Sequence, residues 1–207
     1  MSGGAIVYVV DDDPSVRKAT ARLFRTAGFN VESFRSADEF LEHPASDLPG
    51  CVILDLEMPG RSGIELQKEL TSRQIGLPIV FMTGHADVPT TVTAMKQGAV
   101  DFLPKPVEDD QLIETVSRAI ENYSAELIQK SDVREFRIRL SLLTRREHEV
   151  MMLVIEGLLN KQIAARLGVT EATVKVHRGR VMQKAEVSSV ADLVRVARRA
   201  GVRPVAP

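Results

Sequence analysis

Strand-like apolar runs alternate with helix-like segments through the first 120 residues, and this alternation constrains the fold more than any other feature. The runs are rich in Val, Ile and Phe, and they read "AIVYVV" (5–10), "VESF" (31–34), "CVILDL" (51–56), "LPIVFMT" (77–83) and "VDFLP" (100–104). A segment between them, "PSVRKATARLFRTAG", is amphipathic and runs from Pro14 to Gly28, the usual order of helix start and stop signals. Five strands alternating with helices predict a doubly wound α/β domain with a five-stranded parallel sheet.

Polar side chains stand where four of these runs end: Asp11, Asp12, Asp13, Asp55, Thr83 and Lys105. The carboxyl ends of parallel strands meet at one edge of the sheet, where such folds bind their ligands. We therefore expect these side chains to lie close together. Carboxylates crowded in this way repel one another, so the pattern predicts a compensating positive charge, supplied by Lys105 and a bound cation.

Mg²⁺ suits such a cluster because it is a hard ion that prefers oxygen ligands and takes only a few carboxylates. A carboxylate held beside Mg²⁺, Lys105 and the hydroxyl of Thr83 can receive a phosphoryl group, since this transfer needs mainly positioning and charge neutralisation. The plainer alternative is that the aspartates only cap the helix that starts at Pro14. The polar residues at the other strand ends weigh against it. His85, which follows Thr83, is interpreted as a surface residue.

Charge is distributed unevenly along the 207-residue chain, although the net charge is only −1. Residues 141–207 carry 12 Lys and Arg against 6 Asp and Glu, a balance of +6, and residues 1–140 carry 15 against 22. The split predicts two domains with different partners, of which the basic one faces nucleic acid. The single cysteine, Cys51, excludes an intramolecular disulfide. No apolar run reaches the roughly 18 residues of a membrane span, and the first residues do not resemble a signal peptide, so we expect a cytoplasmic protein.

A long helical pattern follows the last strand and then becomes charged, with sparse apolar positions and no Gly or Pro over 122–140. We predict three parts: a domain over 1–121, a helical linker over 122–140 and a second domain over 141–207. The apolar positions 116, 120, 123 and 127 could form a short coiled-coil seam or pack on the first domain, and the sequence leaves both open.

The second domain reads as helical throughout and contains a helix-turn-helix pattern. Thr144 and Glu147 form a capping box, and "NKQIAARLG" is followed by "VT" and "EATVKVHRGRVMQKA". At helical spacing, one side of the last helix is apolar: Val174, Val181 and Ala185. The other side is basic, polar and small: Ala172, Lys175, Val176, Gly179, Arg180 and Gln183. Such a face can meet base edges in the major groove of DNA, and Gly179 either allows close approach or is a tolerated surface glycine.

Residues 5–120 resemble the receiver domain of bacterial two-component response regulators, in the stretches "VVDDDPSVRK", "ILDLEMPGRSG", "IVFMTGHADV" and "AMKQGAVDFLPKP". The resemblance implies that Asp55 is the phosphoacceptor. It also implies that Asp11 and Asp12 are the acidic pair, and that Mg²⁺ binds Asp12, Asp55 and the backbone carbonyl of Glu57.

The same resemblance assigns roles at the remaining strand ends. Thr83 and Phe102 would be the switch pair, although spacing alone favours ordinary core packing for Phe102. Lys105 would bind the phosphoryl group, aimed by a cis peptide bond before Pro106. Asp13 is given only a helix-capping role.

Residues 141–200 resemble the LuxR-type helix-turn-helix, so the whole chain resembles FixJ/NarL-type response regulators. The resemblance implies that Lys175 and Val176 read bases. Phosphate-contact or positioning roles would fall to Asn160, Lys161, Thr170, Thr173 and Arg178, with Arg180 on the same basic face. Many relatives carry a longer polar residue at the position of Gly179. His177 is interpreted as a packing residue.

These features together predict a transcription factor, not an enzyme, that is switched when a sensor histidine kinase phosphorylates Asp55. Phosphorylation would promote a homodimer that binds double-stranded promoter DNA, with RNA polymerase as a candidate further partner and no membrane contact. The alternative is a Mg²⁺-dependent phosphotransferase or phosphatase that forms an aspartyl phosphate. The chain has "DLEMPG" where that class would carry D-x-D-x-T, and the alternative leaves the DNA-binding pattern unexplained.

Overall fold

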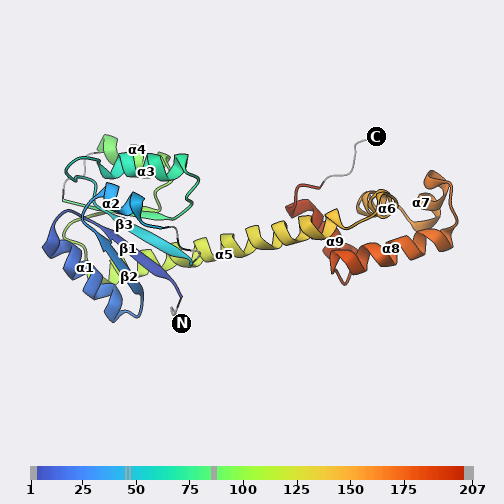
Figure 1. Cartoon of the computed structure of the whole chain (residues 1–207), viewed down its shortest axis with the longest axis horizontal. Coiled ribbons are helices and arrows are strands. Elements are labelled where there is room, and N and C mark those ends of the chain that lie inside the picture. The colour runs from blue at the N-terminus through green and yellow to red at the C-terminus, as the bar shows by residue number, and fades with distance from the viewer. Residues whose placement is uncertain (1–3, 45, 47, 85–87, 203–207) are drawn as a thin grey trace. The chain divides into compact units, whose positions relative to one another are not determined.

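The computed structural model describes residues 4–44, 46, 48–84 and 88–202. The chain divides into two compact units, Met1–Leu127 and Ile128–Pro207, and Figure 1 labels the helices of each together with β1, β2 and β3. The first unit contains β1 (Ile6–Val10), α1 (Pro14–Thr26), β2 (Asn30–Phe34), α2 (Ala37–Glu42), β3 (Gly50–Leu54), α3 (Gly63–Ser72), β4 (Ile79–Thr83), α4 (Val88–Lys96), β5 (Asp101–Pro104) and the first half of α5 (Asp109–Ser141).

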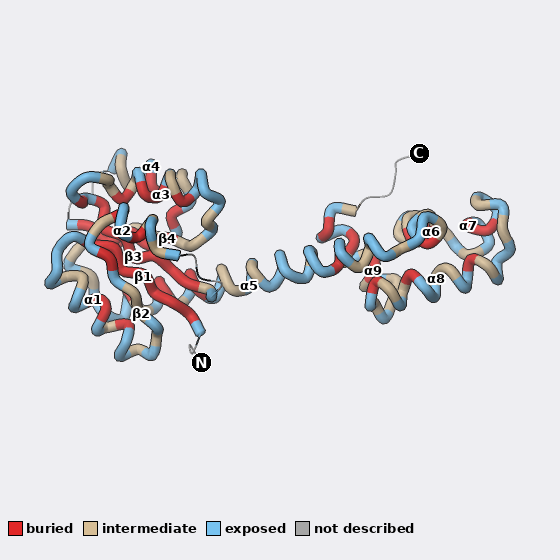
Figure 2. Tube along the Cα trace, in the orientation of Figure 1, coloured by how far each residue is buried: buried red, intermediate tan, exposed pale blue. Residues whose placement is uncertain are grey.

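The five strands form one parallel sheet in the order β2-β1-β3-β4-β5. This confirms the predicted doubly wound fold. The strands β1, β3 and β4 are buried along their whole length (Figure 2), as expected of a sheet that is covered on both faces. One core, which includes Phe40, Leu66 and Ala94, lies under α2, α3 and α4. A second core, which includes Phe24 and Val116, lies under α1 and α5.

The first helix begins where the acidic run ends, because Asp13 caps it. The Asp13 carboxylate accepts hydrogen bonds from the backbone N–H groups of Ser15 and Val16, at 2.7 and 3.4 Å. Pro14 occupies the first turn, where no hydrogen bond from its nitrogen is needed. Asp13 therefore has the capping role expected of it, which leaves Asp11 and Asp12 to explain.

The second unit is all helical and packs around its own core. Its helices, after the second half of α5, are α6 (Arg145–Ile155), α7 (Asn160–Leu167), α8 (Glu171–Ala185) and α9 (Val190–Arg199). The predicted capping box opens α6: Thr144 accepts from the backbone of Glu147, whose side chain accepts from the backbone of Thr144. Met151, Ile163 and Leu193 are buried in this core.

Helix α5 contributes to both units, and its two halves bury different faces. Val116 and Ile120 are buried in the core of the first unit, so the packing alternative holds for these two positions. Phe136 is buried in the core of the second unit, and Val133 and Leu140 pack against it. The division between the units falls within the segment 122–140. Among the described residues, no helix combines the length and the apolar character that a membrane crossing requires.

Candidate functional site

The strand register brings the predicted acidic residues together at one edge of the sheet. Val10 of β1 pairs with Leu54 of β3, so the residues that follow them, Asp11 and Asp55, leave the sheet at the same level. Thr83 of β4 pairs with Pro104 of β5, and the backbone N–H of Lys105 donates to the carbonyl oxygen of Thr83 at 2.7 Å. The strand ends thus meet as the sequence predicted.

Lys105 supplies the positive charge that the carboxylate cluster needs. Its Nζ lies 2.7 Å from Oδ2 of Asp11 and 3.4 Å from Oδ1 of Asp55. Both carboxylates are buried, whereas Asp12 is exposed. The second oxygen of Asp11 accepts from the backbone N–H of Asp13 at 2.9 Å. Lys105 therefore pairs with both buried carboxylates, and the backbone of the loop after β1 also bonds to one of them, that of Asp11.

Burial dominates the electrostatics of Asp55. Desolvation raises the pKa of its carboxyl above the ordinary value, the Lys105 ammonium opposes that rise, and the neighbouring Asp11 adds to it. The Oδ1 atom also accepts from the backbone N–H of Leu56 at 2.9 Å. Because burial disfavours the charged form of Asp55, any further positive charge at this edge would stabilise its carboxylate.

Three carboxylates at this edge fit a divalent ion. One carboxylate oxygen from each of Asp11, Asp12 and Asp55 lies within 4.8 Å of the others. Such a set of oxygen donors suits Mg²⁺, which keeps several waters beside one or two carboxylates. Glu57, whose backbone carbonyl is the further predicted ligand, is an exposed residue two positions after Asp55.

The predicted switch residues occupy neighbouring strands. Thr83 is buried at the end of β4. Phe102 is half-buried on β5 and packs against Phe81, with ring centroids 5.8 Å apart. The peptide bond between Lys105 and Pro106 is cis, as expected. His85 lies outside the described residues.

Two residues that the sequence did not single out shape the site. Arg17, on the first turn of α1, donates to the backbone carbonyls of Asp11 and Asp12 at 2.7 and 3.2 Å. Gly63 begins α3 close to the end of β3, where a Cβ atom would collide with the backbone oxygen of Asp55. The helix can approach this closely because the residue has no side chain.

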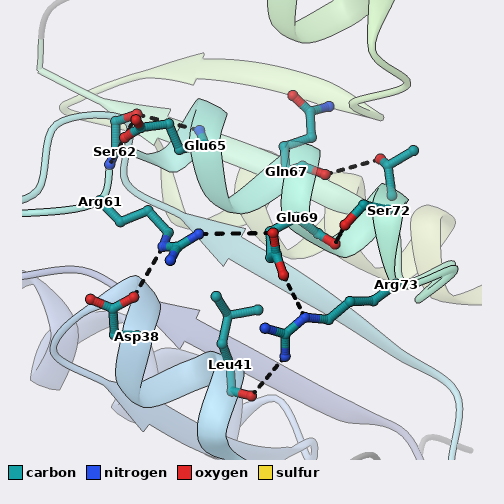
Figure 3. Close-up of polar contacts among 10 residues, drawn as sticks. Asp38, Leu41, Arg61, Ser62, Glu65, Gln67, Glu69, Ser72 and Arg73 are labelled. Carbon is teal, nitrogen blue, oxygen red and sulfur yellow. Dashed lines mark hydrogen bonds and ion pairs between the residues drawn. The ribbon is translucent and has the colours of Figure 1, made fainter.

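Figure 3 shows how the loop after Asp55 is fastened to its surroundings. Arg61 of this loop pairs with Asp38 of α2 at 3.0 Å and lies 4.0 Å from Glu69 of α3. Arg73 pairs with the other oxygen of Glu69 at 2.7 Å and donates to the carbonyl oxygen of Leu41 at 3.3 Å. The loop is therefore held to both α2 and α3 by side chains that stay partly in water.

The second unit presents the predicted helix-turn-helix as α7, a turn at Gly168 and α8. Val174, Val181 and Ala185 are buried on the inner side of α8. Its outer side is exposed, as are Lys161 on α7 and Thr170 before α8. Among the predicted DNA contacts on that side are Lys175, Val176 and Arg180. Val176 is apolar and yet 53% exposed, which is the condition for an apolar contact with a thymine methyl group.

Four other residues predicted to contact DNA form two hydrogen-bonded pairs. The Thr170 hydroxyl caps α8 by accepting from the backbone N–H of Thr173 at 3.2 Å, and the two hydroxyls lie 2.9 Å apart. Arg178 of α8 donates to Oδ1 of Asn160 of α7 at 2.8 Å. These hydrogen bonds are compatible with a positioning role, and the sequence left both this role and phosphate contact open for the four residues.

Gly179 and His177 are two further residues of α8 for which the sequence raised a question. A Cβ atom at Gly179 would meet nothing within 4 Å, so packing within the chain does not require glycine there. His177 is half-buried, and among the described residues its buried Nδ1 has no hydrogen-bond partner. Its place between core and surface agrees with a packing role.

Comparison with protein families matches two parts of the chain. Residues 7–117 match the response regulator receiver domain, and residues 141–197 match the luxR family of bacterial regulatory proteins. Nodulation protein W of Bradyrhizobium diazoefficiens is 45% identical over 198 residues, covering 96% of this chain and 87% of that protein. The transcriptional regulatory protein FixJ of Rhizobium meliloti is 42% identical over 198 residues, covering 96% and 97%.

Solved structures give the same result over nearly the whole length. The response regulator StyR matches with a TM-score of 0.84 and 47% identity, covering 95% of this chain and 99% of that one. Full-length FixJ from B. japonicum matches with a TM-score of 0.60 and 42% identity, covering 97% and 98%. With both domains matched in this order and at these identities, the chain belongs to the family of transcriptional response regulators that join a receiver domain to a LuxR-type DNA-binding domain.

Proposed function

We propose that Asp55 is the phosphoacceptor of this response regulator and that a partner histidine kinase supplies the phosphoryl group. The observation that carries the proposal is the pairing of Lys105 with both Asp11 and Asp55 at the strand ends. A carboxylate oxygen of Asp55 attacks phosphorus and forms the new O–P bond. The bond from phosphorus to the kinase histidine nitrogen breaks, and the nitrogen keeps the electron pair.

Lys105 is placed to follow the charge during this transfer. Its ammonium can turn from the Asp55 carboxylate to the incoming phosphoryl oxygens while it keeps its contact with Asp11. Mg²⁺ held by Asp11, Asp12, Asp55 and the backbone carbonyl of Glu57 would neutralise further negative charge on those oxygens. Thr83 hydrogen-bonds another phosphoryl oxygen through its hydroxyl.

We place the kinase at a groove beside the site. It has a volume of about 760 Å³ and runs between α1 and the start of α5. Its walls include the apolar side chains of Val16, Leu23 and Val107, and Lys105 and Pro106 line it at the acidic edge. A kinase helix docked there would bring its histidine to Asp55.

Phosphorylation then changes the face of the receiver formed by α4 and β5. The phosphoryl group adds about −1.5 to −2 charge, which draws Thr83 toward it and vacates space for Phe102 to turn inward. Helix α4 carries an exposed apolar stripe at helical spacing: Val88, Val92 and Met95 are 75%, 44% and 43% exposed. We propose that a second copy of the chain covers this stripe.

The dimer would bind promoter DNA through α8, with Lys175 and Val176 at base edges and Lys161 and Arg180 toward the phosphates. The domain boundaries proposed for this function remain 1–121 and 141–207, joined within α5. Because the chromosome is its target, we place the protein in the cytoplasm, with RNA polymerase as a candidate partner at the promoter.

The phosphoacceptor is tested with acetyl phosphate and Mg²⁺, followed by a gel that retards phosphorylated protein. We expect one phosphoryl group per wild-type chain and none in Asp55→Asn. The matched control is Asp13→Asn, which changes an acid that only caps α1 and should leave labelling intact. Full labelling of Asp55→Asn would overturn the assignment. Continuous release of phosphate far beyond one equivalent would instead support an enzyme.

A further inference from the structure

The two carboxylates of the acidic pair are held in different ways. Asp11 uses both of its oxygens, because Oδ2 pairs with Nζ of Lys105 at 2.7 Å and Oδ1 accepts from the backbone N–H of Asp13 at 2.9 Å. The carboxylate of Asp12 is exposed, and within the described part of the chain it has no hydrogen bond or ion pair. One of its oxygens nevertheless lies within 4.8 Å of oxygens of Asp11 and Asp55. The direction of this carboxylate therefore depends on the backbone of Asp12.

Arg17 holds that backbone on both sides of Asp12. Its Nη1 donates to the carbonyl oxygen of Asp11 at 2.7 Å and to the carbonyl oxygen of Asp12 at 3.2 Å. The first carbonyl belongs to the peptide unit before the Cα atom of Asp12, and the second belongs to the unit after it. Because each peptide unit is planar, restraining both units restrains the two soft dihedrals of Asp12, and with them the direction of its Cβ atom.

The place of Arg17 in α1 is unfavourable unless such bonds form. Arg17 lies in the first turn after the N-cap Asp13, and its own backbone N–H donates to the carbonyl oxygen of Asp13 at 3.0 Å. The positive end of the helix dipole lies at this turn, so a cation is disfavoured there, and the turn contains no acidic residue. The two charge-assisted bonds to the loop 11–13 offset this cost. The half-buried side chain is therefore tied to the loop and is not merely solvated.

We propose that Arg17 is a positioning residue for Mg²⁺, which it affects by orienting Asp12 as a ligand. The inference rests on the Mg²⁺ site of the proposed function. It predicts an effect opposite in sign to that of charge alone. The guanidinium is a cation beside a cation site, so its removal would strengthen Mg²⁺ binding if repulsion were its only effect. Loss of orientation weakens binding instead, since partners that orient metal ligands typically contribute about 10–100-fold to metal affinity.

The test is a Mg²⁺ titration of the ¹⁵N-labelled, unphosphorylated full chain, followed by NMR at the backbone amides of residues 11–13. Arg17→Met keeps the aliphatic stem but loses the charge and both bonds, and we expect its Mg²⁺ affinity to fall about tenfold. Arg17→Lys keeps the charge and one nitrogen that can donate, so it should recover part of the loss. The matched control is Lys18→Met. Lys18 is exposed on the same helix and makes no hydrogen bond or ion pair with any described residue, so this variant should bind Mg²⁺ at least as tightly as the wild type.

A double-mutant cycle tests whether Arg17 acts through Asp12. Asp12→Asn weakens Mg²⁺ binding by itself, and Arg17→Met should add little in that background, because the ligand that Arg17 orients is already lost. The same loss in both backgrounds would overturn the proposal. So would an Arg17→Met variant that bound Mg²⁺ as tightly as Lys18→Met.

Labelling by acetyl phosphate separates positioning from a direct role in the transfer. At saturating Mg²⁺, the labelling rate of Arg17→Met should return to near that of the wild type, because the affinity for the ion is what changes. A rate that stayed low would overturn the proposal in favour of direct contact with the phosphoryl group. If the wild type showed no saturable Mg²⁺ shifts, the metal site of the proposed function would fail and this inference with it. Wild-type binding that Arg17→Met left unchanged would overturn this inference alone.

Discussion

At the scale of single residues, Glu147 links the start of α6 to α8, the helix proposed to read DNA. Its buried carboxylate accepts from Nζ of Lys184 at 2.7 Å and from the backbone N–H of Thr144 at 2.9 Å. These bonds favour the charged form, with that from Lys184 first, and hold the pKa of Glu147 at about 2 against an ordinary 4.5. Lys184 also donates to the carbonyl oxygen of Leu142 at 3.1 Å. The pair of Glu147 and Lys184 therefore joins α8 to the start of α6 and to the residues that precede it.

The low pKa of Glu147 predicts how the stability of the second unit depends on pH. A carboxyl whose pKa is depressed by folding stabilises the native state above its unfolded pKa, and loses that contribution as pH falls through the folded value. We expect this contribution to disappear between about pH 4.5 and about pH 2. Glu147→Gln should cost about 1.5–3 kcal/mol at pH 7, the value of a hydrogen bond to a charged group, and should flatten the acid dependence. Urea unfolding followed by circular dichroism measures both effects.

The control for this prediction lies on the same helix. Glu149 also pairs with arginines, Arg145 and Arg146, but its side chain is 33% exposed, against 3% for Glu147. Solvent screens these pairs more, so Glu149→Gln should change stability less. If the two variants lost equal stability and kept the same pH dependence, burial of Glu147 would not be the source of its contribution.

At the scale of elements, α8 should separate sequence discrimination from general affinity for DNA. Base contacts specify sequence, whereas phosphate contacts position the protein. Discrimination is the difference in binding free energy between a site selected from random DNA and unselected DNA. Lys175→Ala and Val176→Ala should each reduce this difference by about 1–3 kcal/mol. Lys161→Ala should weaken both affinities equally and reduce the salt slope by about one. Titrations at several salt concentrations distinguish the two patterns.

Arg195 provides the comparison, because it is an exposed arginine of α9 paired with Asp192 and lies outside the helix-turn-helix. Arg195→Ala should leave discrimination unchanged. Should Lys175→Ala and Val176→Ala behave like Arg195→Ala, α8 would not be the reading helix.

Elements with strong local periodicity could be predicted from the sequence, and elements defined by distant contacts could not. The buried side of α8 follows directly from helical spacing, and Val174 and Val181 are buried as predicted. The sequence of the segment 122–140 predicts a linker, because charged residues surround its few apolar ones. Phe136 is nevertheless buried in the second unit. The same core includes Leu193 and Ala197 of α9, and the neighbouring Arg137 of α5 donates to the carbonyl oxygen of Ala200, which caps α9, at 2.9 Å. Local spacing in the sequence cannot indicate such distant contacts.

In the candidate site too, some residues could be predicted from the local sequence, whereas others depend on contacts between distant segments. Asp55, Thr83 and Lys105 could be grouped in advance because a parallel sheet collects its strand ends, whatever the details of packing. Arg17 could not, because an arginine six residues after Asp11 on an exposed helix is usually only solvated. Gly63 could be read as a helix start signal, but its close approach to Asp55 depends on how α3 packs against β3.

At the scale of the whole molecule, phosphorylation should control DNA binding through dimerisation. Two recognition helices joined in one dimer bind paired half-sites more tightly, because the second contact occurs at high effective concentration. We expect beryllofluoride, which mimics the phosphoryl group, to convert a mostly monomeric chain into a dimer by light scattering. Affinity should rise for half-sites about one helical turn apart, and much less for a single half-site.

The exposed stripe on α4 gives this prediction its specific test. Val92→Asp places a charge in the centre of the proposed interface, so it should keep the chain monomeric and abolish the gain on paired half-sites. Asp55 should still accept a phosphoryl group in this variant, because Val92 is exposed on α4 and lies outside the acidic site. Thr93→Asp puts the same charge on an exposed position off the stripe and should dimerise normally. A constant mass with beryllofluoride, together with unchanged DNA affinity, would contradict dimer control. Release of an inhibitory contact through α5 would then explain the switch better.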